Sequence, residues 1–334
     1  MKRFTVLSVG VLGLVSSLLT THALAQVMGC GDIVVGRVTL LHDLSCPSGH
    51  GLLLADAATL DCAGHRITGG DQSEQYGIYV RDADDVLVEN CVVERFEVGV
   101  RLRGAVNVVV QDTVSRNNTR YGMELTQSSA GAVIQRNTIQ DNGDEGIHVS
   151  GPSDVDAGHQ ILQNTLEGNE KEGIYLLQSS GNMVADNTIQ NNGAAGIYVK
   201  QSNRNTLSRN TLLNDPLQLV YGSQQNILTD NTIVGQAIKF NQASSNRVRN
   251  LSIQANGGQP TVAFDFTASS NNVIIRSGVD DSEFDIKAAS GSTNNVFAKF
   301  SAPSPLSCSV DSTSSVSVRD QSGRMISCAK TTAP

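Results

Sequence analysis

Tryptophan is absent from the 334 residues, and aromatic residues make up only 4% of the chain. A wide globular core normally needs more rings, so the plentiful valine, isoleucine and leucine favour a thin core of stacked aliphatic side chains. Basic residues are a minority, with 24 Lys and Arg against 32 Asp and Glu and a net charge of -8. Because nucleic-acid binding depends on a basic footprint, this balance argues against a nucleic-acid partner. An acidic glycan would need local cations or a bound Ca²⁺, and no other cofactor is indicated.

Long apolar runs are missing except at the start of the chain. Residues 1–25 have the pattern of a secretion signal, with Lys2 and Arg3 before an apolar stretch and a cleavage site at Ala23-Leu24-Ala25. We expect this segment to be removed, the alternative being an uncleaved membrane anchor. No later run is long enough to span a membrane. The sequence therefore predicts a secreted or periplasmic protein and leaves its oligomeric state open.

Cys-x-x-Cys spacing and a nearby histidine pair are also missing, which argues against a zinc site. All six cysteines follow the signal segment, and an even number in an exported chain favours disulfides. For the second pair, two buried thiols are the alternative. Their spread along the chain predicts three local pairs, Cys30–Cys46, Cys62–Cys91 and Cys308–Cys328.

A degenerate repeat of about two dozen residues runs through the chain. The segments 137–149, 164–176 and 187–199 share an Asn-Thr-Ile-like start, a polar turn, a glycine and an alternating strand. Short β-branched strands at this period leave no room for a helix, and the Leu-x-x-Leu-x-Leu phrase of leucine-rich repeats is missing. The glycines before the strands are 22, 23, 24, 27 and 23 residues apart, at Gly77, Gly99, Gly122, Gly146, Gly173 and Gly196.

The repeat predicts one coil of strands per period. Stacked coils place equivalent residues about 4.8 Å apart, so we expect aligned asparagines to hydrogen-bond as ladders inside the turns. The glycine is expected at a corner that needs an unusual backbone angle. One expected ladder runs through Asn182, Asn205, Asn226, Asn246 and Asn272, and the other through Asn90, Asp112, Asn137, Asn164, Asn187, Asn210, Asn231 and Asn250.

The predicted fold is all-β, a single right-handed parallel β-helix (solenoid) of about eleven coils over residues 51–300. The late segments 261–275 and 283–297 keep the order of a strand followed by Asn-Asn. With neighbouring coils separated by the usual distance between paired strands, about 4.8 Å, the rod would be on the order of 50 Å long. Because an open coil end is an exposed strand edge, residues 26–50 are expected to form an N-terminal cap and residues 301–334 a C-terminal cap or tail.

The phrase LDCAGHRITG (60–69), the Asn90-Cys91 pair and the run of Asn-x-Ile…Gly-Ile coils resemble the right-handed parallel β-helix repeat superfamily. That superfamily includes pectate-lyase-like polysaccharide lyases, glycosidases, mannuronan C5-epimerases and periplasmic β-helix proteins associated with copper delivery to nitrous oxide reductase. The resemblance covers roughly residues 50–300. It implies the fold and a polysaccharide partner, whereas the activity of each member depends on its own site.

The diagnostic motifs of these enzymes are missing. A polygalacturonase would show Asn-Thr-Asp, Asp-Asp and Gly-His-Gly on neighbouring coils, but Asp84-Asp85 is isolated and Gly158-His159 is followed by Gln160. The Asp-Pro-His of the alginate epimerases is absent, and no His/Met cluster supports copper binding. Any activity must therefore be argued from the residues on the faces of the coils.

Strand alternation predicts which side chains face outward. The residue after each glycine should enter the core, and the next residue should point outward. This outward position carries an unusual concentration of rings and ionisable groups. Coil by coil, the residues at this position are Tyr79, Arg101, Glu124, His148, Tyr175, Tyr198, a slipped coil near Val220, and Lys239. The next outward column adds Arg81, Arg103 and Lys200. The flanking turn carries Asp144, Glu145, Lys171 and Glu172.

Lyases and epimerases that act on uronic acids need a cation, a base and an acid. We assign Arg101 to neutralise the substrate carboxylate, His148 to remove the C5 proton and Tyr175 to act as acid or relay. Glu124 would orient Arg101 or His148. Hydrolysis would instead need a carboxylate pair, for which Glu124 with Asp144 or Glu145 is the local candidate.

A row of tyrosines on a rigid sheet can stack against sugar rings, so we expect a polysaccharide partner. A lyase or C5-epimerase reaction is one option, a non-catalytic glycan-binding module is a second, and a cell-envelope or surface scaffold that binds protein is a third. The histidines in caps and turns, namely His42, His50, His65 and His159, are expected to be structural. The expected substrate-binding residues are Tyr79, Arg103, Asp144, Lys171, Tyr198 and Lys200.

Overall fold

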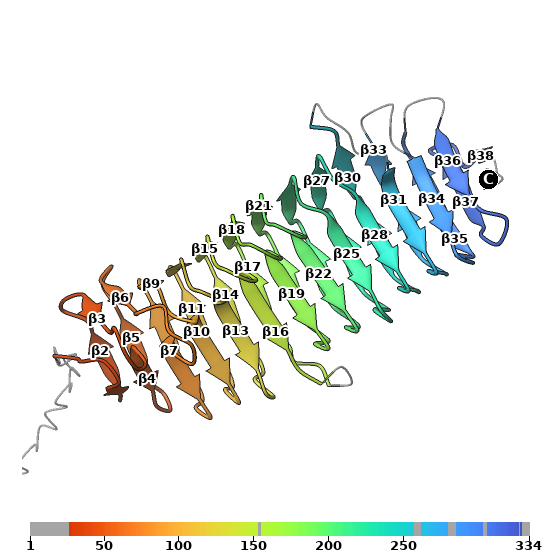
Figure 1. The fold of residues 1–334 in the computed structure, drawn as a ribbon. Coiled ribbons are helices and arrows are strands. Elements are labelled where there is room, and N and C mark those ends of the chain that lie inside the picture. The colour runs from red at the N-terminus through yellow and green to blue at the C-terminus, as the bar shows by residue number, and fades with distance from the viewer. Residues whose placement is uncertain are drawn as a thin grey trace, which may run out of the picture.

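The structure, a computed structural model, describes residues 27–152, 155–256, 262–279, 285–302, 306–326 and 328. The predicted signal segment, residues 1–25, lies outside the described residues. Within the described ranges every regular element is a β-strand, and none of them contains a helix long and apolar enough to cross a membrane. The coils stack into a rod, with the first and last coils at opposite ends (Figure 1).

Each coil contributes short strands in turn to three sheets that run along the rod. The first sheet contains β1 (Ile33–Val34), β4 (Leu52–Leu54), β7 (Tyr76–Arg81), β10 (Val98–Arg103), β13 (Tyr121–Thr126), β16 (Ile147–Ser150), β19 (Ile174–Leu177), β22 (Ile197–Lys200), β25 (Leu217–Val220), β28 (Ile238–Asn241), β31 (Val262–Thr267), β34 (Asp285–Ala289) and β36 (Ser307–Val310). The second contains β2 (Arg37–Thr39), β5 (Thr59–Asp61), β8 (Leu87–Glu89), β11 (Val109–Gln111), β14 (Val133–Gln135), β17 (Gln160–Leu162), β20 (Met183–Ala185), β23 (Thr206–Ser208), β26 (Ile227–Thr229), β29 (Arg247–Arg249), β32 (Val273–Ile275), β35 (Asn295–Phe300), β37 (Val316–Asp320) and β38 (Met325–Ile326). The third contains β3 (Leu44–Ser45), β6 (Arg66–Thr68), β9 (Val92–Glu94), β12 (Val114–Arg116), β15 (Thr138–Gln140), β18 (Thr165–Glu167), β21 (Thr188–Gln190), β24 (Thr211–Leu213), β27 (Thr232–Val234), β30 (Ser252–Gln254) and β33 (Gly278–Val279).

The coils form a parallel solenoid of about 12 turns, which confirms the predicted fold class. Among the described residues neighbouring strands pair in parallel, except that β37 and β38 pair antiparallel. The strands β1, β2 and β3 already pair with β4, β5 and β6, so residues 33–45 supply a coil of their own. At the other end, β36 and β37 extend the first and second sheets beyond residue 300.

The core is a narrow stack of inward side chains. The residue after each repeat glycine is at most 1% exposed, as the alternation predicted, at Ile78, Val100, Met123, Ile147, Ile174 and Ile197. In the last coils phenylalanine fills inward positions, and in the second inward column Phe240 stacks on Phe266 with ring centroids 4.9 Å apart. The few aromatic residues of the core are therefore concentrated at the C-terminal end of the rod, where the Asn-Thr-Ile phrase is weakest.

The repeat glycines are required by close packing, and the predicted reason, an unusual backbone angle, is wrong. None of these glycines has a positive φ among the described residues. A Cβ on Gly122 would lie 2.4 Å from Ile139 Cγ2 and 2.7 Å from the carbonyl oxygen of Gly146 on the next coil. Glycine is needed because the backbone of the next coil and an inward side chain already fill the volume that a Cβ would occupy.

The asparagine ladders are present. In the first predicted ladder each backbone N–H donates to the side-chain oxygen one coil further along, from His159 through Asn182, Asn205, Asn226, Asn246, Asn272 and Asn295. The second runs from Cys91 through Thr113, Asn137, Asn164, Asn187, Asn210 and Asn231. A third, which sequence reasoning missed, connects Asn118, Asn142, Asn169, Asn192 and Asp215.

Three members of the second predicted ladder are one residue too early. Asn90, Asp112 and Asn250 are exposed turn residues with φ of 56°, 49° and 49°, and the buried position is the residue that follows each of them. Asparagine and aspartate suit both a left-handed turn position and a buried ladder position. Residue type alone therefore could not separate the two neighbouring places.

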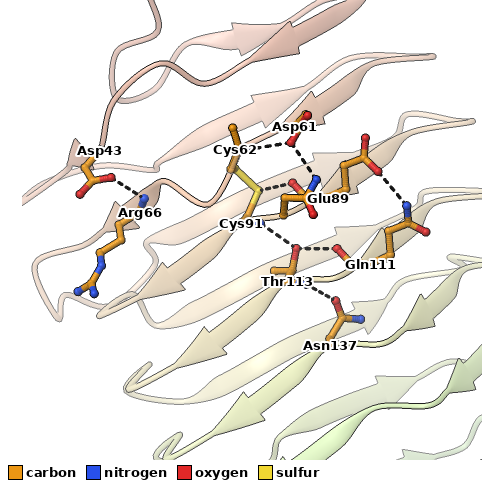
Figure 2. Close-up of a disulfide and its surroundings, with 11 residues drawn as sticks. Asp43, Asp61, Cys62, Arg66, Glu89, Cys91, Gln111, Thr113 and Asn137 are labelled. Carbon is orange, nitrogen blue, oxygen red and sulfur yellow. Dashed lines mark hydrogen bonds between the residues drawn. A yellow bond between two sulfur atoms is a disulfide. The ribbon is translucent and has the colours of Figure 1, made fainter.

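All three predicted disulfides are present, Cys30–Cys46, Cys62–Cys91 and Cys308–Cys328. Cys62 and Cys91 are fully buried, with Cα atoms 4.7 Å apart. Figure 2 shows Cys91 donating its backbone N–H to Thr113 Oγ1, while the backbone N–H of Thr113 donates to Asn137. The disulfide thus caps the second ladder, and disulfides of this kind are consistent with an extracellular protein.

Candidate functional site

The predicted outward residues lie in one row on the first sheet. Register pairs Tyr79 with Arg101, Arg101 with Glu124, Glu124 with His148, and His148 with Tyr175. The row continues through β22 to β28. We call it the outer column: Tyr79, Arg101, Glu124, His148, Tyr175, Tyr198, Gln218 and Lys239.

The predicted slip near Val220 does not occur. Gln218 holds the outer-column position, paired with Tyr198 on one side and Lys239 on the other. Val220 pairs with Lys200 and belongs to the second outward column. Pro216 occupies the position at which Gly196 stands one coil earlier, so the glycine marker failed there although the register was kept.

Several side chains of the outer column face outward yet are largely covered. Tyr79, Glu124 and His148 are 5%, 9% and 8% exposed. Part of the cover comes from Tyr76 and Tyr121, which sequence reasoning missed. The available signal was the tyrosine directly before the repeat glycine in YGIYV (76–80) and YGMEL (121–125).

Arg101 is held by a carboxylate on one side and a ring on the other. Its Nε lies 2.8 Å from Glu124 Oε2, and both side chains are mostly buried. Its guanidinium carbon lies 4.4 Å from the ring centroid of Tyr76, a cation–π distance. The ring of His50 in turn stacks on Tyr76 at 4.9 Å, and its Nδ1 accepts the Tyr76 backbone N–H. Burial and the positive charge of Arg101 lower the pKa of His50, so this histidine, predicted to be structural, is a neutral member of the aromatic face.

His148 lies between two tyrosines. It stacks on Tyr121 with ring centroids 4.6 Å apart and meets the edge of Tyr175 at 5.3 Å. Its Nδ1 lies 3.8 Å from Glu145 Oε2, and neither atom has a hydrogen-bond partner within the described residues. Of the two partners predicted for Glu124, Arg101 is the one with which it forms an ion pair, whereas the carboxylate beside His148 Nδ1 is that of Glu145.

The acid–base state of the tyrosines follows from burial. Burial, then the neighbouring Tyr198 and Glu172, raises the pKa of Tyr175 to about 12. Burial and the charge of Glu145 raise the pKa of Tyr121 further, and the same two causes raise the pKa of Glu172. Tyr175 is therefore protonated at neutral pH, so it can donate a proton or a hydrogen bond and does not serve as a resting base.

The flanking turn carries a chain of ion pairs. Arg120 lies 3.5 Å from Glu97 and 3.6 Å from Asp144, and Lys171 Nζ lies 2.7 Å from Asp144 Oδ1. Asp144 and Lys171, both predicted to bind substrate, thus bind each other. They border the outer column and neutralise much of each other's charge.

The second outward column is more open. Arg103 Nε donates to Gln127 Oε1 at 2.5 Å, and Lys200 Nζ lies 5.4 Å from the ring centroid of Tyr221. Neither cation pairs with a carboxylate in the part of the chain that the structure describes. No group of three or more His, Cys, Asp or Glu able to hold a metal ion occurs there either. Such a face offers rings and two cations, Arg103 and Lys200, that lie four coils apart along the rod.

A family model described as right-handed β-helix region matches residues 39–159, 132–237 and 156–320. The chain belongs to the right-handed β-helix family. A search of curated proteins finds no match. Membership accounts for the coil and the hand of the rod, whereas a shared coil does not define a reaction.

Solved structures share the fold of this β-helix protein at low sequence identity. An alginate lyase from Paenibacillus sp. str. FPU-7 has a TM-score of 0.54 and 16% identity, covering 72% of this chain and 92% of its own. A DFA-IIIase from Arthrobacter chlorophenolicus A6 has a TM-score of 0.53 and 14% identity over 73% and 72% of the two chains. A GH87 α-1,3-glucanase catalytic unit from Streptomyces thermodiastaticus strain HF3-3 has a TM-score of 0.54 and 12% identity over 89% and 64%. At these identities the likeness concerns the fold alone.

Proposed function

We propose that this protein is a secreted or periplasmic polysaccharide-binding β-helix, with the sugar chain lying along the outer column. The observation that carries this proposal is the continuous series of ring contacts on one sheet face, from Tyr121 through His148 and Tyr175 to Tyr198. Aromatic faces and edges held on a rigid sheet suit the alternating apolar and polar surfaces of sugar rings. The structural relatives named as an alginate lyase and an α-1,3-glucanase support a carbohydrate as the partner class.

The same face offers groups for modifying the bound chain. His148 has an unpaired Nδ1 and would serve as the base, Tyr175 is protonated and would donate, and Arg101 would neutralise a carboxylate with its remaining N–H groups. Glu124 holds Arg101 in place for that role. Tyr79, Arg103, Tyr198 and Lys200 would contact sugar on either side of this centre, while Asp144 and Lys171 would shape its border. A lyase or C5-epimerase reaction on a uronic acid polymer is the reaction class that these groups fit.

The deciding experiment screens the purified protein against alginate, pectin, glycosaminoglycans and neutral glucans, with and without Ca²⁺. Retention of a polymer and the absorbance of unsaturated products are measured together. Binding that falls about tenfold in Tyr175→Ala and Tyr198→Ala supports the proposed face, since stacking contributes on the order of 1 kcal/mol per ring. Arg247→Ala, an exposed position on β29 of the second sheet and outside the outer column, is the control and should bind as the unmodified protein does.

The variants also separate an enzyme from a binding module. Turnover that disappears in His148→Ala and Arg101→Ala, with folding intact, indicates a reaction at this centre. Retention that survives His148→Ala without any turnover indicates a binding module. If no polymer is retained or altered under any condition, both ideas fail and a protein-binding scaffold is the remaining function.

A further inference from the structure

Two arginines border a hollow on the second sheet, away from the outer column. The hollow has a volume of about 250 Å³ and is lined by Thr229, Arg249, Asn250, Ile275 and Arg276. Register places Thr229, Arg249 and Ile275 side by side on β26, β29 and β32. Neither Arg249 nor Arg276 makes a hydrogen bond or an ion pair with a carboxylate within the described ranges, and both side chains are exposed.

Other coils of the same chain show what Arg276 lacks. Arg136 and Arg209 occupy the same turn position, since all three follow a strand of the second sheet and have φ of 54°, 54° and 50°. Each of the first two binds an aspartate on the preceding coil through two N–H groups, Arg136 with Asp112 and Arg209 with Asp186. The chain thus uses a repeated Asp–Arg pair at this turn.

The coil before Arg276 breaks this pattern. Its corresponding residue is Asn250, because Arg249 pairs with Ile275 in register. The Asn250 amide is already committed, since its Nδ2 donates to Asp230 Oδ1 at 2.7 Å. On the following coil the equivalent position is Lys299, since Ile275 pairs with Ala298. Three cations therefore lie on consecutive coils, namely Arg249, Arg276 and Lys299. On earlier coils an arginine at this turn has an aspartate on the coil before it.

We propose that the Arg249–Arg276 hollow binds an oxyanion, a sulfate, phosphate or carboxylate group. Guanidinium groups present parallel N–H donors that match two oxygens of such a group, as Arg136 and Arg209 match Asp112 and Asp186. The bound oxyanion supplies the negative charge that an aspartate supplies on earlier coils and that Asn250 lacks. Thr229 borders the same hollow and adds a hydroxyl donor. This site is on another sheet from the outer column and does not depend on the proposed polysaccharide function.

The test titrates inorganic sulfate, inorganic phosphate and acetate into the full chain at low ionic strength, with chloride at matched ionic strength as reference. Chemical-shift changes of arginine side chains or calorimetry give the affinity. Because both guanidiniums are exposed, we expect saturable binding in the millimolar range that weakens as salt rises. The oxyanion that binds most tightly identifies which of the three groups the site prefers.

Two variants test the site in different ways. Arg276→Gln should weaken binding about tenfold, a loss of one charge-assisted contact. Asn250→Asp keeps both arginines but places a carboxylate beside Arg276, as on earlier coils, so it should weaken oxyanion binding by a similar factor. The matched control Arg209→Gln removes an already paired arginine and should leave binding unchanged.

Three results overturn the proposal. The first is an absence of saturation with all three anions. The second is binding that Asn250→Asp leaves intact, and the third is an equal loss in Arg209→Gln and Arg276→Gln. Loss of glycan binding in the outer-column variants has no bearing on any of them.

Discussion

Glu145 Oε2 lies 3.8 Å from His148 Nδ1, and both atoms are buried without a hydrogen-bond partner among the residues described. Glu145 is only 5% exposed, and its charge is one of the causes that raise the pKa of Glu172 and Tyr121. A buried polar atom left without a partner costs free energy of folding. These two unpartnered atoms therefore lower the stability of the folded protein. Such a loss is expected where a side chain serves a function rather than stability.

Glu145→Met should raise the free energy of unfolding by about 1 kcal/mol, because it removes an unpaired buried oxygen and keeps an unbranched side chain. Denaturant unfolding measures the change, and the pKa of Glu172 should fall at the same time. Glu124→Met is the matched control. It should destabilise by about 3 kcal/mol, since it leaves Arg101 without its carboxylate. A loss of stability in Glu145→Met would contradict the cost inferred for this pair.

Asp215 ends the third ladder and makes stability depend on pH. Its side chain is fully buried, and burial raises its pKa to about 6 against an ordinary 3.8, although the N–H groups of Asn192 oppose that shift. Between these two values the folded protein binds the proton more tightly than the unfolded chain does. Stability should therefore fall as pH rises from about 4 to 6, by ~3 kcal/mol at most, and stay level above.

Asp215→Asn should remove that fall and give a protein more stable than the unmodified chain at pH 7. The reason is that asparagine fills the ladder position without a charge to bury. Denaturant unfolding between pH 4 and 8 measures both effects. The same slope in both proteins would show that another group is responsible.

Gly122→Ala should destabilise the rod by about 3 kcal/mol, since the new Cβ would meet the Gly146 carbonyl at 2.7 Å and Ile139 at 2.4 Å. Gly64→Ala is the matched control for backbone strain. Gly64 has φ of +86° and open space around its Cβ position, so the change should cost only about 1 kcal/mol. Thermal unfolding of the two variants compares the costs. Equal costs would contradict close packing as the reason for the repeat glycine.

Asn187→Ala should cost about 3 kcal/mol or more. The Asn164 backbone N–H and Nδ2 both donate to Asn187 Oδ1, and Asn187 Nδ2 donates to the carbonyl oxygen of Ile161. The substitution leaves these groups buried and unpaired. Asn191→Gly, at an exposed turn position with φ of 55°, should stay within about 0.5 kcal/mol. Urea unfolding of both variants checks the difference, and similar midpoints would refute the ladder's contribution.

The fold could be predicted because its signals are local and repeated. The period, the alternation after each glycine and the even cysteines led to a parallel solenoid, to the inward column from Ile78 to Ile197 and to all three disulfides. Each of these depends on a spacing that is the same in every coil. The register of one pair of strands therefore fixes the next.

Errors arose where one residue type serves two neighbouring places. Asn90, Asp112 and Asn250 suit a left-handed turn as well as a ladder, and Pro216 replaced the glycine used as a marker. The third ladder was missed because its members, such as Asn142 and Asn169, stand among many polar turn residues. Whether such a residue lies in the exposed turn or in the buried ladder depends on how the coils stack, and a single repeat does not show that.

The sequence by itself determined which side chains share the outer column, because alternation along a strand and the length of a coil set that row. Only the tertiary structure decided what the row touches. Tyr76 and Tyr121 cover it, Glu124 forms an ion pair with Arg101, and the carboxylate beside His148 Nδ1 is that of Glu145. Those contacts depend on side-chain directions and on turns from different coils, and a spacing along the chain does not contain that information.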